Sequence, residues 1–217
     1  MSNDVKEQVS AWAYLKELPC EREEFLFVAD ERDDREILGI FNYVCQEKKC
    51  RIECFYNKIT GDFILRRIFG LNEYNDISFI TPKLAIFEIL LQEKLFDVIN
   101  EMSFFANAPV CMSLQRKGIT DWEFKEFLPE VLHDFELYIT PKTPMRLING
   151  SYIVIDYSNF VSQAQFVVYY NELRSEFYAE KKVKGIVETT NCMDAKNIKE
   201  LEKKLVDLPE ILQGFAK

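Results

Sequence analysis

The alternation of apolar and polar residues within 50–56 constrains the fold of this chain more than any other feature. Its apolar positions are Cys50, Ile52, Cys54 and Tyr56, with Arg51 and Glu53 between them. Successive side chains of a strand point to opposite faces, so this pattern predicts a half-buried strand. The turn at 57–62 contains Gly61 and leads into a second apolar run, Phe63–Phe69. The two segments predict an antiparallel hairpin with Cys50, Ile52 and Cys54 facing a core.

The composition is that of a folded globular protein. The chain has 217 residues, of which 48% are apolar and 29% charged, which suits one large domain or two small ones without help from a disulfide or a metal. The 18 Phe and 10 Tyr against 7 Gly and 7 Pro favour long regular elements, which argues against a Gly-rich phosphate-binding loop. The six cysteines follow no disulfide rhythm and are predicted to be buried thiols.

Helices are predicted where apolar residues recur at helical spacing. A first helix is expected from a cap at Ser2 or Asn3 to Leu18, and a long, most buried helix from Pro82 to about Met102. Residues 33–49 favour a helix, although Glu36–Cys45 is also compatible with a strand because it is rich in β-branched and aromatic residues. The remaining predicted helices are a segment that starts at Thr120 and is kinked at Pro129, a segment from Phe160 to about Lys182, and a segment from a cap at Asp194 to Leu208.

Strands are predicted, besides the hairpin, at Phe25–Ala29, Val110–Leu114, Glu136–Thr140, Tyr152–Asp156 and Gly185–Thr190. This order of elements predicts an α+β fold, with a mixed, largely antiparallel sheet packed with helices. Residues 1–217 are expected to form a single globular domain; if there are two subdomains, their boundary is expected in the loop at 141–150. Ile80–Lys83 recurs as Ile139–Lys142, which we interpret as a coincidence because nothing around it repeats.

The distribution of charge points to the kind of partner. The net charge is −9, and eight acids meet three bases between Glu21 and Glu36. Nucleic-acid binding is not expected, because neutralising phosphates requires a basic face. No apolar run approaches the roughly 20 residues that cross a bilayer, and the polar residues 1–8 have no signal-peptide character, so a cytoplasmic protein without membrane contact is expected. The oligomeric state is not indicated.

Catalytic signatures are few. The single histidine, His133, limits nucleophilic catalysis to arrangements in which it is the base, and a surface or helix-capping role is favoured for it. Cys45, Cys50 and Cys54 lack the spacing of a zinc knuckle. Neither Cys111 nor Cys192 has an activating neighbour in the sequence. No cofactor and no metal site is expected.

The string Tyr152–Phe160 is the most suggestive of function. It is an apolar strand that ends in Asp156, Ser158 and Asn159, and it resembles, over nine residues, the opening of PIN-like and NYN-type nuclease domains. The resemblance implies that Asp156 is a metal ligand. The residues themselves favour another interpretation, in which these three side chains cap a helix that begins at Phe160.

Three functions are therefore expected, in this order. The first is a non-enzymatic, acidic protein-binding module of the inhibitor or immunity type, which masks a basic partner through Asp30, Glu31, Asp33 and Asp34. The second is a metal-dependent nuclease or phosphodiesterase, with Asp156, Asp194 and Asp30 as its candidate catalytic residues. The third is a scaffold or small-molecule-binding domain.

Overall fold

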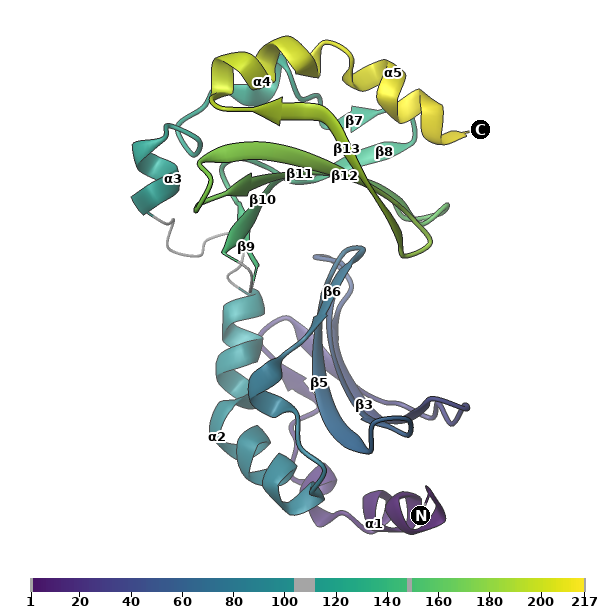
Figure 1. The fold of residues 1–217 in the computed structure, drawn as a ribbon. Coiled ribbons are helices and arrows are strands. Elements are labelled where there is room, and N and C mark those ends of the chain that lie inside the picture. Colours follow the sequence, from purple (N-terminus) through teal and green to yellow (C-terminus); the bar gives the residue numbers. More distant parts are fainter. Residues whose placement is uncertain (1, 104–111, 148–149, 217) are drawn as a thin grey trace. The chain divides into compact units, whose positions relative to one another are not determined.

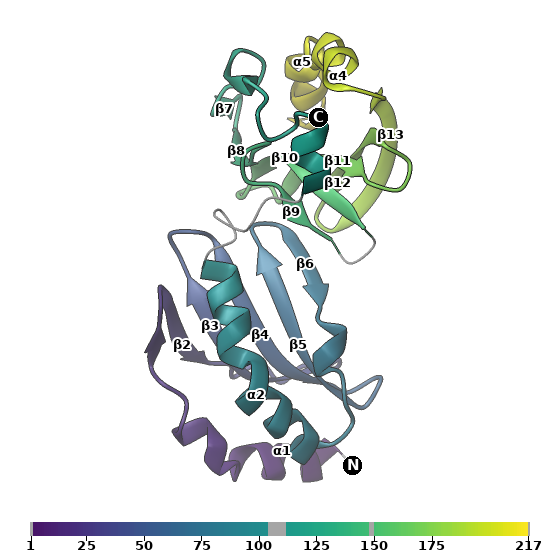
Figure 2. The same ribbon diagram turned by 90° about the vertical axis from the view of Figure 1, so that its left-hand side faces the viewer.

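The chain folds into two compact α+β units, Met1–Phe104 and Phe105–Lys217 (Figure 1). The structure, a computed structural model, describes residues 2–103, 112–147 and 150–216. Each unit contains one sheet whose described strand pairs are antiparallel, with helices on one face (Figures 1 and 2). Within these described ranges, no helix has the length and apolar character needed to span a membrane.

The first unit is a six-stranded meander. Its strands are adjacent in chain order: β1 (Glu21–Arg22), β2 (Phe25–Ala29), β3 (Ile37–Cys45), β4 (Cys50–Asn57), β5 (Asp62–Phe69) and β6 (Asn72–Asn75). The helices are α1 (Ser2–Ser10), α2 (Leu84–Ser103) and the short 3-10 helices η1 (Ala13–Lys16) and η2 (Ile77–Phe79). Phe87 of α2 stacks on Phe63 of β5 at a centroid distance of 5.7 Å, which anchors the long helix to the sheet.

The second unit has a seven-stranded sheet in the order β13-β12-β11-β10-β8-β7, and β9 pairs with β10. The strands are β7 (Val131–Leu132), β8 (Phe135–Ile139), β9 (Met145–Arg146), β10 (Ser151–Asn159), β11 (Ala164–Asn171), β12 (Glu176–Val183) and β13 (Ile186–Ala195). The helices are α3 (Met112–Arg116), η4 (Phe124–Glu126), α4 (Ile198–Leu205), α5 (Leu208–Gln213) and η5 (Gly214–Ala216).

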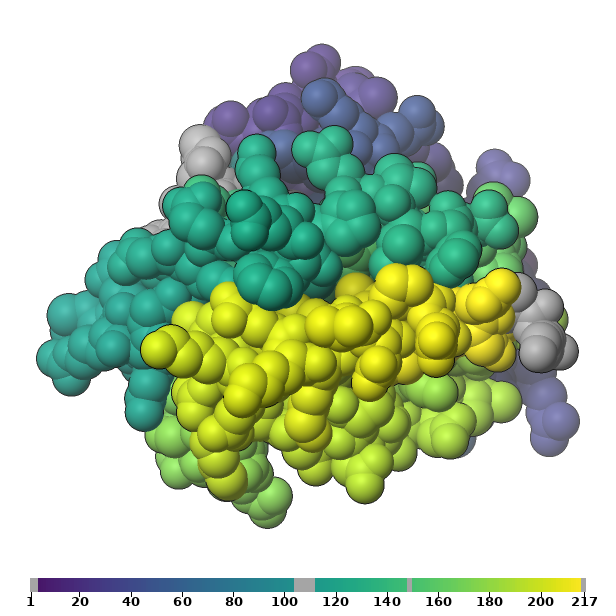
Figure 3. Space-filling view, turned by 90° about the horizontal axis from the view of Figure 1, so that it is seen from above, coloured from purple at the N-terminus to yellow at the C-terminus, as the bar shows by residue number. Residues whose placement is uncertain are grey.

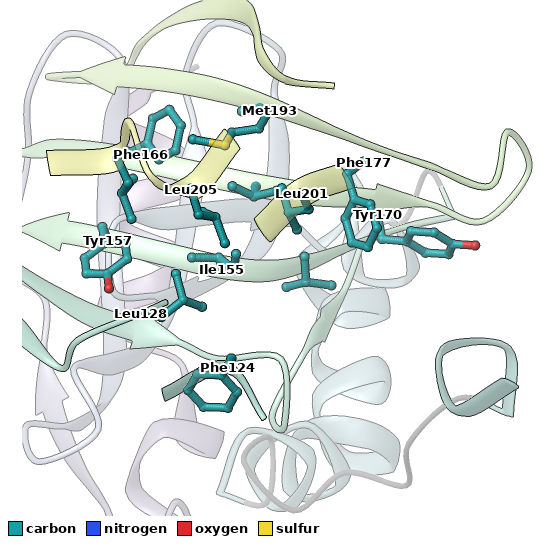
Figure 4. Packing of buried hydrophobic residues seen from close by; sticks show 14 of the residues in the cluster. Phe124, Leu128, Ile155, Tyr157, Phe166, Tyr170, Phe177, Met193, Leu201 and Leu205 are labelled. Atoms are coloured by element: carbon teal, nitrogen blue, oxygen red, sulfur yellow. The ribbon is translucent and has the colours of Figure 1, made fainter. Parts of the chain in front are cut away.

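The core of the second unit lies between its sheet and its helices. Figure 4 shows Leu201 and Leu205 of α4 above Ile155 of β10, and Leu128 and Phe124 below it. At the surface, α4 and α5 lie beside residues 112–147 (Figure 3). Helix α4 begins at Asn197, whose side chain accepts a hydrogen bond from the Glu200 amide, so the predicted cap at Asp194 is wrong.

The second unit repeats the first, element by element. Strands β1 and β2 recur 110 residues later as β7 and β8, whereas β3, β4, β5 and α2 begin 114 residues before β10, β11, β12 and α4. The four-residue difference falls in the loop that joins the second strand to the third, residues 30–36 in one unit and 140–150 in the other. The loop at 141–150 therefore lies within the second unit, while the two units divide between Phe104 and Phe105.

Hydrogen bonds and backbone geometry follow the same register. The Tyr43 hydroxyl donates to the Pro19 carbonyl, and the Tyr157 hydroxyl donates to the Pro129 carbonyl, at 2.8 and 2.7 Å. Left-handed backbone also recurs at matched turns: Glu23 and His133, Lys49 and Gln163, Gly61 and Ser175, Gly70 and Lys184. The two units are thus copies of one fold. Ile80–Lys83 and Ile139–Lys142 do not match in this register.

Several predicted elements are confirmed. Strands β4 and β5 form the antiparallel hairpin, and Cys50, Ile52 and Cys54 are buried. The strands at Phe25–Ala29, Glu136–Thr140, Tyr152–Asp156 and Gly185–Thr190 correspond to β2, β8, β10 and the first half of β13. The long helix after Pro82 is α2.

Other predicted elements are wrong. Residues 37–45 form strand β3, as the alternative interpretation had it, and Phe160–Lys182 forms two strands, β11 and β12. Most residues of β3 and β11 are buried on both faces, so their apolar positions imitate helical spacing, whereas β12 alternates between half-buried and buried residues over 176–180. The first helix ends at Ser10, and the segment after Thr120 holds only the 3-10 helix η4 before β7. Residues 112–114 are helical, and the rest of the strand predicted at Val110–Leu114 lies outside the described residues.

Candidate functional site

The sheet face opposite the helices of the same unit, called here the helix-free face, carries Asp156 in the second unit and a buried carboxylate, Glu53, in the first. In antiparallel strands, directly opposed residues share a face. Pairing across β2 to β6 therefore places Val28, Asn42, Glu53, Arg66 and Asn75 in one row of the first unit's helix-free face. The neighbouring row contains Leu26, Val44, Arg51, Ile68 and Glu73.

A buried carboxylate, that of Glu53, lies at the centre of this face. Its side chain is 4% exposed, and three guanidinium groups approach it: Arg51 at 2.9 Å, Arg32 at 3.6 Å and Arg66 at 3.9 Å. A buried charge is destabilising unless it is paired, and the three arginines supply the positive charge that allows Glu53 to be buried here. Arg66 also lies over the Phe55 ring, 4.9 Å from its centroid.

Asp30 belongs to the same network. Its two carboxylate oxygens accept hydrogen bonds from the Arg32 guanidinium. Burial opposes ionisation of Asp30, but the hydrogen bonds from Arg32 outweigh it and lower the pKa of the carboxyl below its usual value. The carboxylate packs over Gly39: a Cβ added at that position would lie 2.3 Å from Asp30 Cγ. Asp30 is therefore built into the fold of the first unit.

Asp33 and Asp34 also have partners within the first unit. Asp33 accepts hydrogen bonds from Lys58 and Lys6, which lower its pKa to about 2. Asp34 accepts from the amides of Ile37 and Glu36, and these bonds lower its pKa. Of the four residues predicted to bind a basic partner, Glu31 is the one for which no ion pair or hydrogen bond is seen among the described residues.

In the second unit, Asp156 lies within β10 and is fully buried. It accepts hydrogen bonds from Ser158 Oγ at 2.8 Å and from Gln165 Nε2 at 2.7 Å. The predicted helix cap is wrong, because no helix begins at Phe160. Asn159 instead closes the β10–β11 turn by accepting bonds from the amides of Val161 and Ser162.

Tyr169, Glu180 and Lys182 lie near Asp156 on the helix-free face of the second unit. The Tyr169 hydroxyl donates to Glu180 at 2.8 Å, and burial, followed by the charge of Glu180, raises the pKa of Tyr169. Lys182 Nζ lies 5.6 Å from the Tyr169 ring centroid. Burial lowers the pKa of Lys182, against the opposing effects of Glu180 and Asp156. Glu180 thus accepts a hydrogen bond from Tyr169 and lies 3.9 Å from the Lys182 ammonium.

The three candidate catalytic residues are not brought together within a unit. Asp156 lies on β10 and Asp194 on β13, with β11 and β12 between them, a separation of roughly 14 Å at the usual strand spacing. Asp30 belongs to the first unit. In the ranges that the structure describes, no three His, Cys, Asp or Glu side chains are grouped so that they could hold a metal ion.

The surroundings of His133 and Cys54 do not favour a role as catalytic base or nucleophile. His133 lies in the left-handed turn between β7 and β8, and its Nε2 is 3.1 Å from the Pro209 carbonyl oxygen. Burial raises the pKa of the Cys54 thiol well above its usual value, which opposes formation of a nucleophilic thiolate. Cys192 is half-buried, and Cys111 lies outside the described residues.

A polar groove of about 880 Å³ in the second unit was not predicted. Pairing between β12 and β13 is interrupted: Ala179 opposes Thr190, but Phe177 opposes Ala195, so residues 191–194 bulge away opposite Tyr178. The groove at this bulge, the β12–β13 groove, is lined by four carboxylates, one arginine and one tyrosine: Glu176, Glu180, Glu188, Asp194, Arg174 and Tyr178. The groove depends on which residues of β12 and β13 oppose each other. This register cannot be read from the sequence before the strand pairing is known.

Two of these carboxylates are engaged inside the unit. Glu176 accepts a hydrogen bond from Lys196, which lowers its pKa, and Glu180 accepts from Tyr169. Glu188 and Asp194 are exposed, and no ion pair is seen for either one within the described part of the chain. The groove therefore presents two exposed carboxylates for which no ion pair is seen in the described residues, beside the Tyr178 ring and Arg174.

No protein-family model, curated protein sequence or solved structure matches this chain.

Proposed function

We propose that this protein is a non-enzymatic binding protein, of the inhibitor or immunity type, that holds a basic protein partner through the β12–β13 groove. The observation that carries this proposal is the presence of Glu188 and Asp194, exposed and without ion pairs among the described residues, in a groove that also contains Tyr178. Carboxylates recognise lysine and arginine by charge-assisted hydrogen bonds, and an aromatic ring attracts the same cations.

The groove suits this role better than the acidic segment at Glu21–Glu36. In that segment, Asp30, Asp33 and Asp34 are held by Arg32, by Lys58 and Lys6, and by backbone amides. Their charge is therefore largely compensated inside the first unit. The net charge of −9 contributes to long-range attraction of a basic partner, while the groove supplies the contact.

The test is an NMR titration with a short lysine peptide. The amide shifts of residues 188–194 are expected to move, and this response is expected to disappear in the double variant Glu188→Gln/Asp194→Asn, which keeps the side-chain shapes and removes both charges. The matched control is Glu21→Gln/Glu31→Gln, which removes two exposed charges of the first unit and is expected to leave the groove response unchanged.

Two outcomes contradict the proposal. One is a response spread over acidic residues of both units without concentration at the groove. The other is equal binding by Glu188→Gln/Asp194→Asn and by the unmodified protein.

A further inference from the structure

The long helix α2 has two apolar faces. One face is buried against the first sheet and contains Phe87, Leu91, Leu95, Val98, Ile99 and Met102. On the opposite side, Ile86, Ile89 and Phe96 are 43%, 48% and 36% exposed. At about 100° per residue these three side chains fall within roughly 80° of arc, so they form one stripe along the helix, with Glu93 between Ile89 and Phe96. Figure 2 shows α2 in front of its sheet, with the outer side toward the viewer.

The second unit shows that the fold does not require this stripe. In the repeat register, Ile86, Ile89 and Phe96 match Glu200, Lys203 and Glu210 on α4 and α5. The same difference between apolar and polar residues is found just before α2 and α4, where the exposed residues Ile77 and Ile80 match Asn191 and Asp194. One unit thus carries polar and charged residues at these outer positions, and the other carries large apolar ones. An exposed apolar patch of this kind marks an interaction surface.

The spacing of the stripe is that of a helix–helix seam. Ile86, Ile89, Glu93 and Phe96 are separated by three, four and three residues, the a and d positions of a heptad pattern. In two antiparallel helices related by a two-fold axis near residue 91, Ile86 of each copy faces Phe96 of the other. Glu93 is the one charged residue among these four, and the Arg22 guanidinium lies 5.1 Å from the centroid of the Phe96 ring.

The charges beside the stripe select the antiparallel arrangement. Lys83, near the start of α2, and Asp97, near its end, lie on the same flank of the stripe, and both are exposed. In an antiparallel helix pair, the residues along one side of the stripe lie against the residues along the same side of the other copy's stripe, which run in the opposite direction. Lys83 of one copy therefore approaches Asp97 of the other, twice by symmetry.

From these observations we infer that the outer face of α2 is a homodimer surface, on which a second copy of this chain packs its own α2 in antiparallel orientation. The proposal is independent of the β12–β13 groove, because it involves different residues on the other unit.

The test is the mass in solution, measured by sedimentation equilibrium over micromolar to hundred-micromolar concentrations. The unmodified protein is expected to be a dimer of the 25.6-kDa chain. The triple variant Ile86→Glu/Ile89→Lys/Phe96→Glu, which places the residues of the second unit on α2, is expected to be a monomer with unchanged circular dichroism. Lys203→Glu, a charge change on the matched helix, is the control and is expected to remain dimeric.

Two further variants test the geometry. Glu93→Leu makes all four a and d positions apolar and is expected to tighten the dimer. Lys83→Asp and Asp97→Lys are each expected to weaken it, and their combination is expected to restore it. A monomeric unmodified protein, which would leave the stripe for a different partner, or a triple variant that stays dimeric overturns the inference.

Discussion

The indole Nε1 of Trp122 donates a hydrogen bond of 2.8 Å to the Glu202 carboxylate on α4. In the first unit, the indole of Trp12 makes the same bond to Glu88 on α2. In both units this bond ties the segment before the sheet to the helix after it, across 80 and 76 residues of sequence. Among the described residues, it is the polar contact of longest sequence separation that the two copies share.

Trp122→Phe is expected to destabilise the second unit, because it leaves the Glu202 carboxylate without its donor. A hydrogen bond to a charged group contributes roughly 1.5–3 kcal/mol. Denaturant unfolding measures the loss, and Trp12→Phe is expected to have a similar effect on the first unit. The control, Glu210→Gln on the exposed side of α5, is expected to change little. A loss no larger than the control's would show that the bond is not stabilising.

Asp156→Ala is expected to cost roughly 2–4 kcal/mol of unfolding free energy, because it leaves the buried donors Ser158 and Gln165 without an acceptor. Asp156→Asn is expected to cost less, since its amide oxygen still accepts one of the two bonds. Asp194→Ala, at an exposed position, serves as the control. If Asp156→Ala is as stable as the control, the buried polar cluster does not stabilise β10.

Gly39→Ala is expected to destabilise the first unit by about 1–3 kcal/mol, because the new Cβ would overlap the carboxylate of Asp30. The second substitution Asp30→Ala is expected to recover part of that loss by removing the overlapping group. Gly214→Ala is the matched control, since no atom lies near its Cβ position. Equal stability of Gly39→Ala and Gly214→Ala would contradict the close approach.

The pKa of Asp33 is expected to rise from about 2 toward 3.8 when Lys58 is changed to Met, because Lys58 is its main hydrogen-bond donor. A depressed carboxylate pKa stabilises the folded state above the unfolded pKa, and this contribution disappears as the pH falls from about 4 toward 2. An NMR titration of the Asp33 carboxyl measures the shift directly. Lys49→Met, which changes a lysine outside this cluster, is expected to leave the midpoint unchanged.

The sequence predicts strands well where polar residues alternate with apolar ones and poorly where the apolar run is unbroken. Arg51 and Glu53 keep the alternation of β4 visible, so the β4–β5 hairpin could be found. In β11, the run Ala164–Tyr170 is buried throughout, and without polar residues on one face its period cannot be distinguished from a helix.

The repeat and the groove could not be predicted for a different reason. Few matched positions keep the same residue, among them Trp12 and Trp122, Pro19 and Pro129, and Tyr43 and Tyr157. These residues are fixed by hydrogen bonds that become visible only with the fold. Asp30, Asp33 and Asp34 were correctly singled out as a concentration of charge, but their partners, Lys6 and Lys58 among them, come from distant parts of the sequence.

The division between Phe104 and Phe105 also sets the order of events on the ribosome. Every strand of the first sheet, together with α2, is translated before residue 105. Domains fold as units during synthesis, with the N-terminal one first. Strands β2 to β5 therefore have neighbours on both sides before β10 to β13 emerge, which protects two copies of one fold from exchanging these strands.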